Sequence, residues 1–386
     1  MISPVTEAAV AGRTVLVRAG LDVPMEKNGR IADTFRLQRA LPTLVWLRKR
    51  GAHIVLLGHH GQPHGHRSRA LSLRPVAPAL ARLLKAPVDF SDLQQTQQRT
   101  RSLRPGSVLL VENLRFHLGE ERASPSFARK IAALGNLYVN DDFSTSHRAH
   151  ASMVLLPKLL PAYAGLNLVK EMSALDRVRL RPRRPFIVMV GGGKVGDKFG
   201  VIETLLPKAD RLLLGGAGAL TFLRARGVPV GTSLIDTTLA VHSIRRVLRS
   251  AKIRTPVDWR VARKPSSPAT VVDVGAIPPR SAAYDIGPAT VRLFLRELRG
   301  ARTVLWAGPM GLYEQPAFAH GTRAMIRGMP RSAYSVAGGG DTIAAIHKAR
   351  AAGNFAFLST SGSAMLAYLA GELLPALRAL DRSQEP

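Results

Sequence analysis

Residues Ser335–Ile343, with the sequence SVAGGGDTI, are the stretch from which the fold of this chain is predicted. An apolar run ends there in Gly338, Gly339 and Gly340, and Asp341 and Thr342 then open a helical pattern. This order predicts a strand, a tight turn and a helix N-terminus. Glycines let backbone N–H groups approach an anion, and the helix dipole favours negative charge at that end. The alternative is that the glycines only allow close packing of strand and helix.

The carboxylate that follows the glycines adds a second element of chemistry to this turn. Asp341 stands beside the backbone groups that would hold a polyphosphate. Magnesium is bound in proteins by one or two carboxylates together with substrate phosphates. The stretch therefore predicts a Mg²⁺–nucleotide site, if the rest of the chain supports it.

Length and composition limit the classes of protein to which the chain can belong. A length of 386 residues predicts two or three domains, and 46% hydrophobic residues suffice for packed cores. Cysteine is absent from the sequence, which excludes disulfides, thiolate metal sites and thiol catalysis. The first residues lack the pattern of a signal peptide, and no run of 18 apolar residues occurs, so we expect a soluble, cytoplasmic protein with no membrane partner.

The charge balance is unusual, because 55 basic residues against 26 acidic residues give a formal net charge of +29. Such a charge is compatible with binding to nucleic acid or an anionic membrane. The arginines are, however, spread over nearly every segment, and aromatic residues that could stack on bases make up only 5% of the chain. A small polyanionic substrate is therefore favoured over nucleic acid as the partner.

Short aliphatic runs alternate with longer helical patterns along the chain, which is typical of βαβ units and parallel sheets. The predicted strands cover residues 14–18, 53–57, 107–111, 137–140, 185–190, 211–214, 257–261, 303–306, 333–337 and 355–359. A polar amphipathic segment over residues 168–180 is predicted to be a helix that connects two halves of similar size. We therefore expect an α/β fold with two doubly wound parallel-sheet, Rossmann-like domains joined by an interdomain helix and hinge.

Ligands of open α/β sheets bind beyond the carboxyl ends of the strands, so the residues after each strand are the candidates for binding. In the first half, basic residues dominate these positions: Arg18, His59, His60, Arg115, His117, His147, Arg148 and His150. In the second half, glycines recur there with Lys194 and Lys198. Arginine pairs bidentately with carboxylates and phosphates, and a glycine and lysine cradle suits a nucleotide. Two complementary anion sites predict a phosphotransferase with two substrates.

Two common nucleotide-binding patterns are absent from the sequence. GGGKVGDK at residues 191–198 does not have the spacing of a Walker A motif, and no GxGxxG opens a βαβ unit. P-loop and dinucleotide-binding functions are therefore disfavoured.

A series of motifs runs through almost the whole chain: VLVRAGLDVP, DTFRLQRALPT, LLGHHGQP, VENLRFH, NDDFSTSHRAHAS, GGGKVGDKFGVIETLL, LLLGGAGALTFLRARG, YDIGPAT, WAGPMGLYE, AGGGDT and STSGSA. In their order and spacing, these motifs resemble those of the phosphoglycerate kinase family. The resemblance implies a hinge-bending, usually monomeric enzyme that transfers a phosphoryl group between ATP and 3-phosphoglycerate in glycolysis, with Mg²⁺. It further implies a phosphoglycerate-binding domain over residues 1–167 and an interdomain helix with a nucleotide-binding domain over residues 168–363. A C-terminal helix over residues 364–386 would return to the first domain.

The same resemblance implies roles for individual residues. The phosphoglycerate side would be formed by Arg18, Gly20, Leu21, Asp22, Arg36, His59, His60, Gly61, Gln62, Arg115 and Arg148. The nucleotide side would be formed by Lys194, Lys198, Gly216, Glu314, Gly338, Gly339, Gly340, Asp341 and Thr342, with Asp341 as the Mg²⁺ ligand. Arg36, Lys194, Lys198, Gly339 and Gly340 would act on the transferred group. Positioning and positive charge are what a loose phosphoryl-transfer transition state requires.

Several positions depart from the pattern of the family. The chain has Gly20 and Asp22 where the family has Asp and Asn, and Gln62 where it has Arg. Ala307 replaces Asn in WNGP, and serines replace glycines at 361 and 363, where a positive φ would strain them. These departures leave open a divergent relative with another acceptor acid or a non-catalytic anion-binding role.

Overall fold

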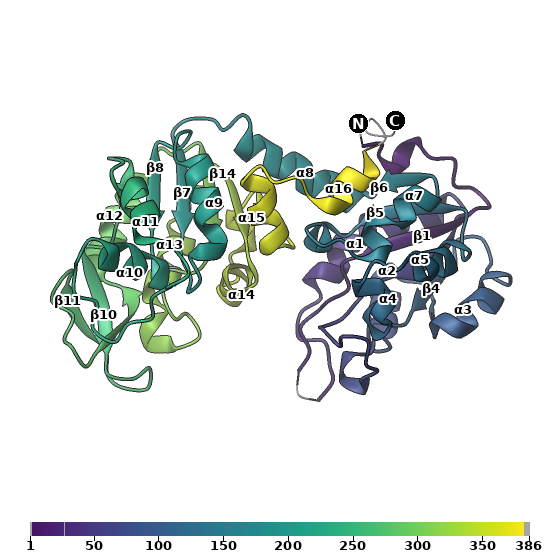
Figure 1. Ribbon diagram of the computed structural model, residues 1–386, viewed down its shortest axis with the longest axis horizontal. Coiled ribbons are helices and arrows are strands. Elements are labelled where there is room, and N and C mark those ends of the chain that lie inside the picture. The colour runs from purple at the N-terminus through teal and green to yellow at the C-terminus, as the bar shows by residue number, and fades with distance from the viewer. Residues whose placement is uncertain (1, 27, 382–386) are drawn as a thin grey trace. The chain divides into compact units, whose positions relative to one another are not determined.

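The computed structural model describes residues 2–26 and 28–381. Its described residues form two compact units (Figure 1). Unit 1 takes its residues from 1–173 and 373–386, and unit 2 comprises residues 174–372. The end of the expected C-terminal helix, residues 382–386, lies outside the described residues.

Unit 1 is built on a six-stranded parallel sheet with the strand order β3-β4-β2-β1-β5-β6. The strands are β1 (Thr14–Ala19), β2 (His53–Leu57), β3 (Val88–Ser91), β4 (Val108–Val111), β5 (Leu137–Asp141) and β6 (Ala162–Ala164). The first strand pairs with its neighbours through Thr14 to His53 and through Val15 to Leu137. Its residues from Val15 onward are buried, because helices cover both faces of a doubly wound sheet.

Unit 2 contains a second six-stranded parallel sheet, with the order β15-β14-β13-β7-β8-β9. The strands are β7 (Phe186–Val190), β8 (Arg211–Leu214), β9 (Ile253–Arg254), β13 (Thr303–Ala307), β14 (Tyr334–Gly338) and β15 (Phe357–Leu358). The chain winds outward in one direction from β7 and in the other from β13. Loops after these two strands diverge to opposite faces, which opens a crevice suited to a ligand. The two doubly wound sheets confirm the predicted fold class.

A small antiparallel sheet with the order β11-β10-β12 also belongs to unit 2. Its strands are β10 (Asp258–Ala262), β11 (Thr270–Asp273) and β12 (Ala282–Ile286). The strand expected at residues 257–261 exists, but it belongs to this sheet and not to a parallel one. Its neighbours along the chain are close enough to fold back on it, so no crossover helix is needed.

Helices flank the sheets as the alternating pattern predicts (Figure 1). Those of unit 1 are α1 (Phe35–Lys49), α2 (Val76–Leu84), α3 (Leu93–Thr100), α4 (Leu118–Glu121), α5 (Pro125–Ala132), α6 (Ala151–Val154), α7 (Leu156–Leu159) and α16 (Pro375–Leu380). Those of unit 2 are α9 (Gly196–Leu205), α10 (Gly216–Ala225), α11 (Val241–Leu248), α12 (Pro288–Leu298), α13 (His320–Arg327), α14 (Gly340–Lys348) and α15 (Ser363–Leu369). The connecting helix expected at 168–180 is α8 (Leu166–Arg179), which crosses the boundary between the units.

The last helical segment is divided between the two units. Where a single helix was expected from residue 364, α15 packs on α9 in unit 2 and α16 packs on α6 in unit 1. Gly371, with φ of 86°, lies between them, and Pro375 is the first residue of α16. Glycine readily adopts a left-handed conformation that ends a helix, and proline is favoured in the first turn of the next one.

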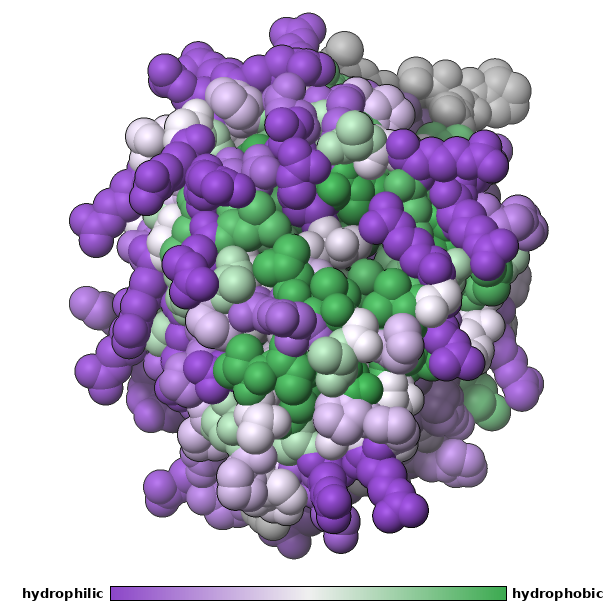
Figure 2. All heavy atoms as spheres, turned by 90° about the vertical axis from the view of Figure 1, so that its left-hand side faces the viewer, coloured by the Kyte–Doolittle hydropathy of each residue, from purple (hydrophilic) through white to green (hydrophobic). Residues whose placement is uncertain are grey.

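The surface of the chain is rich in hydrophilic side chains. Figure 2 shows them projecting on every side of one face, around an apolar area near its centre. Among the exposed large hydrophobic side chains are Val257, Val271 and Val274 of the small sheet region. No helix of the described residues is long and apolar enough to cross a membrane.

Candidate functional site

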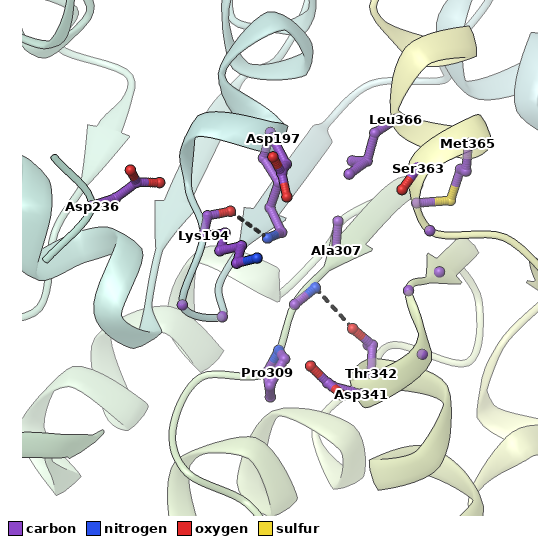
Figure 3. Close-up of a pocket in the computed structure, with 18 of the residues that line it drawn as sticks. Lys194, Asp197, Asp236, Ala307, Pro309, Asp341, Thr342, Ser363, Met365 and Leu366 are labelled. Atoms are coloured by element: carbon purple, nitrogen blue, oxygen red, sulfur yellow. Dashed lines mark hydrogen bonds between the residues drawn. The ribbon is translucent and has the colours of Figure 1, made fainter. Parts of the chain in front are cut away.

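A cavity of about 860 Å³ lies in unit 2 at the carboxyl ends of β7, β13 and β14. Figure 3 shows Lys194 on one wall, Asp341 and Thr342 on another, and Ala307 between them. The wall also contains Gly338, Gly339 and Gly340. The parallel register of these strands brings their ends to one edge, so residues more than a hundred positions apart meet there. The structure thus joins the glycine stretch and the two lysines in one site.

The three consecutive glycines differ in their surroundings. A Cβ on Gly338 would lie 2.3 Å from the sulfur of Met365, so a side chain there would force the end of Met365 to move. Gly339 has φ of 96°, a conformation that side chains disfavour. A Cβ on Gly340 would meet no atom within 4 Å, so the space in front of it is open. The first two glycines shape the turn, and the third leaves the N-terminus of α14 accessible to an anion.

Lys194 and Lys198 lie on the loop after β7 and the first turn of α9. The ammonium of Lys198 donates a hydrogen bond of 2.8 Å to the carbonyl of Lys194 (Figure 3). Burial lowers the pKa of Lys198, against the opposing effect of Asp197, Asp341 and Asp236. A partly desolvated ammonium beside an open cavity gains by binding a phosphate, because the anion replaces the water that the lysine has lost.

Asp341 is exposed on the cavity wall in the first turn of α14. The next residue, Thr342, accepts a hydrogen bond of 2.8 Å from the backbone N–H of Gly308, which ties α14 to the loop after β13. No cluster of three or more potential metal ligands exists among the described residues. A single carboxylate next to a phosphate-binding turn still suits Mg²⁺, which takes its remaining ligands from phosphates and water.

Two residues expected on the nucleotide side do not line this cavity. Gly216 is buried at the start of α10, and a Cβ there would lie 2.6 Å from the backbone nitrogen of Gly192. It therefore packs against the glycine turn after β7. Glu314 is exposed on the segment that follows β13. The strain considered for Ser361 and Ser363 is absent, because neither is among the described non-glycine residues with positive φ.

The sequence pattern did not single out Asp236, which also lines the cavity. Its carboxylate accepts hydrogen bonds from the backbone N–H of Gly196, at 2.8 Å, and from the hydroxyl of Thr238, at 2.6 Å. Hydrogen bonds from Thr238 and Gly196 lower its pKa. Asp236 thereby fixes the N-terminus of α9, which carries Lys198. The segment around it has neither strand nor helix periodicity, so no sequence signal marked it.

The basic residues of unit 1 gather at the carboxyl ends of β1, β2, β4 and β5. Arg18 is completely buried, and its guanidinium donates to Asp142 at 2.7 Å, to Ser152 at 3.1 Å and to the carbonyl of Ala19 at 2.8 Å. It also lies 2.8 Å from Nδ1 of His59. Arg18 thus connects the carboxyl ends of β1, β2 and β5 beneath the surface of the site.

Two histidines of this group are held neutral by their surroundings. Burial, together with the charges of Arg18 and Arg115, lowers the pKa of His59 well below its ordinary value. Burial and the charges of Arg115, Arg18 and Arg148 lower the pKa of His150 to about 3. Burial likewise lowers the pKa of Arg115 to about 10, with further repulsion from Arg18 and Arg148. These shifts show a strongly positive site, which an anionic ligand would relieve.

Asp22 joins Arg36 to the loop after β2. Its side chain lies 3.0 Å from Nδ1 of His60 and accepts a hydrogen bond of 3.0 Å from the backbone N–H of Gly61. Arg36 donates to the main-chain carbonyl of Asp22 and lies 3.5 Å from its carboxylate. Burial raises the pKa of Asp22, but the bonds from His60 and Gly61 and the charge of Arg36 outweigh it, so the pKa is lowered.

The remaining candidates of unit 1 divide into side chains that face the site and those that do not. Arg115 donates to the carbonyl of Gly61 at 2.7 Å, and Arg148 is half-buried. Leu21 is completely buried, so it offers only its backbone to a ligand. A Cβ on Gly20 would lie 3.2 Å from the Asp142 carboxylate, so the Gly20 position is close to an acid already. Gln62 is exposed.

The neutral histidines predict how the stability of the protein depends on pH. His150 has a pKa of about 3 in the folded chain and about 6.5 when unfolded, so the unfolded chain takes up more protons as the pH falls below about 6.5. Its contribution to stability is complete above that pH and is lost below it, at up to about 1.4 kcal/mol per pH unit. Urea unfolding of the full-length chain at pH 7.5 and pH 5.5 should therefore show a smaller loss of unfolding free energy in His150→Gln than in the wild type.

A matched control for this prediction is His242→Gln, which changes an exposed histidine of α11 in unit 2. That variant should lose as much stability on acidification as the wild type. An equal loss in all three proteins would contradict the neutral state of His150.

The comparisons with known proteins agree with this geometry. The family model described as phosphoglycerate kinase matches residues 5–372. The chain is 44% identical to the phosphoglycerate kinase of Thermomicrobium roseum and 43% identical to that of Rhodospirillum centenum, in each case over 97% of this chain and 98% of the relative. The phosphoglycerate kinase structure from Coxiella burnetii covers all of both chains with a TM-score of 0.86 at 33% identity. That from Pyrococcus horikoshii covers 98% of both with a TM-score of 0.88 at 31% identity. The chain therefore belongs to the phosphoglycerate kinase family, as its motifs predicted.

Proposed function

We propose that this enzyme transfers a phosphoryl group reversibly between ATP and the carboxylate of 3-phosphoglycerate through the two sites described above. The observation that carries the proposal is the complementarity of these sites. Unit 1 gathers arginines beside histidines whose pKa is lowered by burial and by the charges of those arginines, and unit 2 offers a glycine turn, two lysines and a carboxylate. The first suits a small acid with a phosphate group, and the second suits Mg²⁺ with a nucleotide.

The residues divide the work between binding and transfer. Arg36, Arg115, Arg148 and His59 hold the acid, while Arg18 positions His59 from below. On the other side the N-terminus of α14 and Gly340 receive phosphate oxygens, Lys194 and Lys198 neutralise their charge, and Asp341 holds Mg²⁺. A loose transition state for phosphoryl transfer requires positive groups and N–H donors around its equatorial oxygens. No side-chain nucleophile is needed, because the acid and the nucleotide supply the reacting oxygens.

The alternative of a divergent relative gains no support from the comparisons, since relatives named phosphoglycerate kinase cover nearly the whole chain. The departures at Gly20 and Ala307 remove side chains but leave the transfer groups in place. We further propose that the protein is a cytoplasmic monomer and that its positive charge does not serve nucleic acid.

The test is a coupled assay of the purified protein with ATP and Mg²⁺ at increasing concentrations of 3-phosphoglycerate, in moderate salt. Saturable formation of ADP that depends on 3-phosphoglycerate is expected. Nucleotide binding without turnover would refute the activity and would point to another acceptor acid. Addition of double-stranded DNA in low salt should leave the rate unchanged.

The role of Asp341 predicts a specific change in metal dependence. Asp341→Asn keeps the shape of the side chain but removes the charge that attracts the cation. We expect a higher Mg²⁺ concentration for half-maximal rate, by roughly tenfold if about 1.4 kcal/mol of attraction is lost. The measurement is the rate against free Mg²⁺ at constant nucleotide.

A matched control is Asp273→Asn, which changes an exposed carboxylate of β11 in the small sheet. This variant should have the metal dependence of the wild type. An unchanged Mg²⁺ requirement in Asp341→Asn would remove Asp341 from the metal site.

A further inference from the structure

The carboxylate of Asp22 occupies an unexpected place for a negative charge. It lies at the carboxyl end of β1, in the group of side chains that the proposed function assigns to an anionic acceptor. Its side chain is 34% exposed, so a ligand in front of it would feel its charge. The low pKa of Asp22 keeps that charge at every pH at which the enzyme would work. Another acid placed nearby is repelled unless the charge is cancelled.

Two side chains are in position to cancel the charge of Asp22. The guanidinium of Arg36 lies 3.5 Å from its carboxylate and is always positive. His60 is the second, with Nδ1 at 3.0 Å from the other carboxylate oxygen and a side chain only 11% exposed. An imidazole carries positive charge only when it is protonated. Arg36 is thus a constant partner of Asp22, and His60 is a variable one.

The main chain around His60 is held by hydrogen bonds, and the imidazole itself is largely buried. The carbonyl of His60 accepts a hydrogen bond of 2.7 Å from Asn113, and the next residue, Gly61, donates its N–H to the same carboxylate oxygen that faces the imidazole. Arg115 holds the carbonyl of Gly61 from the loop after β4. The loop that carries His60 is therefore held beside Asp22 by hydrogen bonds from Asn113 and Arg115 and by the bond from Gly61 to Asp22.

We propose that Asp22 and His60 form a charge pair that determines how strongly the acceptor side binds its anionic substrate. When His60 is protonated, the pair is neutral and Arg36 is free to attract the acid. When His60 is neutral, the remaining negative charge of Asp22 competes with the acid for Arg36. The inference rests on the proposed function, since it assumes that unit 1 holds the acidic acceptor.

Other charged groups face this pair and contribute to any dependence on pH. Besides Arg36, the charge of Arg115 acts on Asp22, and Arg18, Arg148 and Glu121 act in turn on Arg115. His59 and His150, whose pKa is lowered by burial and by the nearby arginines, also belong to this group of side chains. The contribution of His60 must therefore be measured as a difference between variants that keep all these groups.

The experiment is calorimetric titration of the full-length chain with 3-phosphoglycerate at pH 6.0 and pH 8.0. The proteins are the wild type, His60→Gln, Asp22→Asn and the control His242→Gln. Titration of the ligand itself and of the other histidines is common to all four. We expect the ratio of affinities between the two pH values to be roughly three- to tenfold smaller in His60→Gln than in the wild type and the control.

Asp22→Asn separates the charge pair from a purely structural role of Asp22. The amide oxygen can still accept from Gly61, but the negative charge is lost. If the inference is correct, this variant binds 3-phosphoglycerate roughly threefold or more tightly than the wild type at pH 8.0. If Asp22 only supports the loop, the variant binds no better than the wild type, as does Asp22→Ala, and the proposal is overturned.

Turnover measured on the same preparations keeps the two hypotheses apart. If the wild type turns over and the ratio of affinities at pH 6.0 and pH 8.0 is the same in His60→Gln and the wild type, the charge pair alone is overturned. If the affinity ratios are as expected but the wild type shows no turnover, the charge pair is supported and the proposed function is overturned. No binding of 3-phosphoglycerate at either pH overturns both.

Discussion

Replacing Lys198 by alanine is expected to lower the turnover number by a factor on the order of 10² to 10³, by analogy with the loss of other preorganised donors to a transition state. The ammonium lies on the first turn of α9, at a cavity whose other walls carry the glycine turn and Asp341. Burial lowers the pKa of Lys198, which shows that folding has already removed part of the water around its charge before the substrate binds. The developing charge on the transferred group therefore gains the full attraction. The measurement is turnover at saturating ATP and 3-phosphoglycerate.

Two further variants locate the origin of the effect of Lys198. Lys198→Arg keeps the charge but presents a larger, planar group, so it should recover only part of the rate. Lys264→Ala, which changes an exposed lysine in a turn of unit 2, should behave as the wild type. Equal turnover in Lys198→Ala and Lys264→Ala would exclude Lys198 from the transfer step.

Arg36→Ala is expected to have a comparable effect, again on the order of 10² to 10³ in the turnover number. The guanidinium of Arg36 contacts the main-chain carbonyl and the carboxylate of Asp22, among the unit 1 residues that are proposed to bind 3-phosphoglycerate. About a third of the side chain is exposed, which leaves donors available for a ligand. A fixed guanidinium costs little reorganisation when negative charge develops beside it. Steady-state kinetics with 3-phosphoglycerate as the varied substrate should show a lower turnover number together with a higher KM.

The control for Arg36 is Arg101→Ala, an exposed arginine at the end of α3 in the same unit. It removes one positive charge from unit 1 but leaves the residues proposed to bind 3-phosphoglycerate unchanged. If the two variants lose activity equally, the effect comes from the overall charge of the unit, and Arg36 has no direct role in transfer.

The strands in the middle of each sheet were predictable, because their residues are buried on both faces. The runs at 53–57 and 211–214 have the bounds of β2 and β8. Short strands were missed: β6 has three residues, and β3, with the sequence VDFS, includes an exposed aspartate. A strand at the edge of a sheet needs only one partner and one buried face, so its sequence carries little periodicity.

The candidate site was predictable to the extent that chain position determines strand ends. Parallel strands deliver their carboxyl ends to one edge, so basic residues after β1, β2, β4 and β5 could be expected to meet. What each side chain does at that edge was not predictable. Arg18 and Arg115 both lie near the carboxyl end of a strand and both are buried, yet Arg18 donates to Asp142 and Arg115 donates to the carbonyl of Gly61 on a neighbouring loop.

The alternation of strands and helices, the glycine turn before α14 and the membership of a family could be predicted from the order of the residues, because each depends on local order along the chain. Which charges neighbour one another became known only from the folded chain. The pairing of Asp22 with His60 and Arg36, the shifts in the pKa of His59 and His150, and the contact of Asp236 with the N-terminus of α9 all join separate loops. Electrostatic energies depend on distance and burial in three dimensions, and neither quantity is written in the order of the residues.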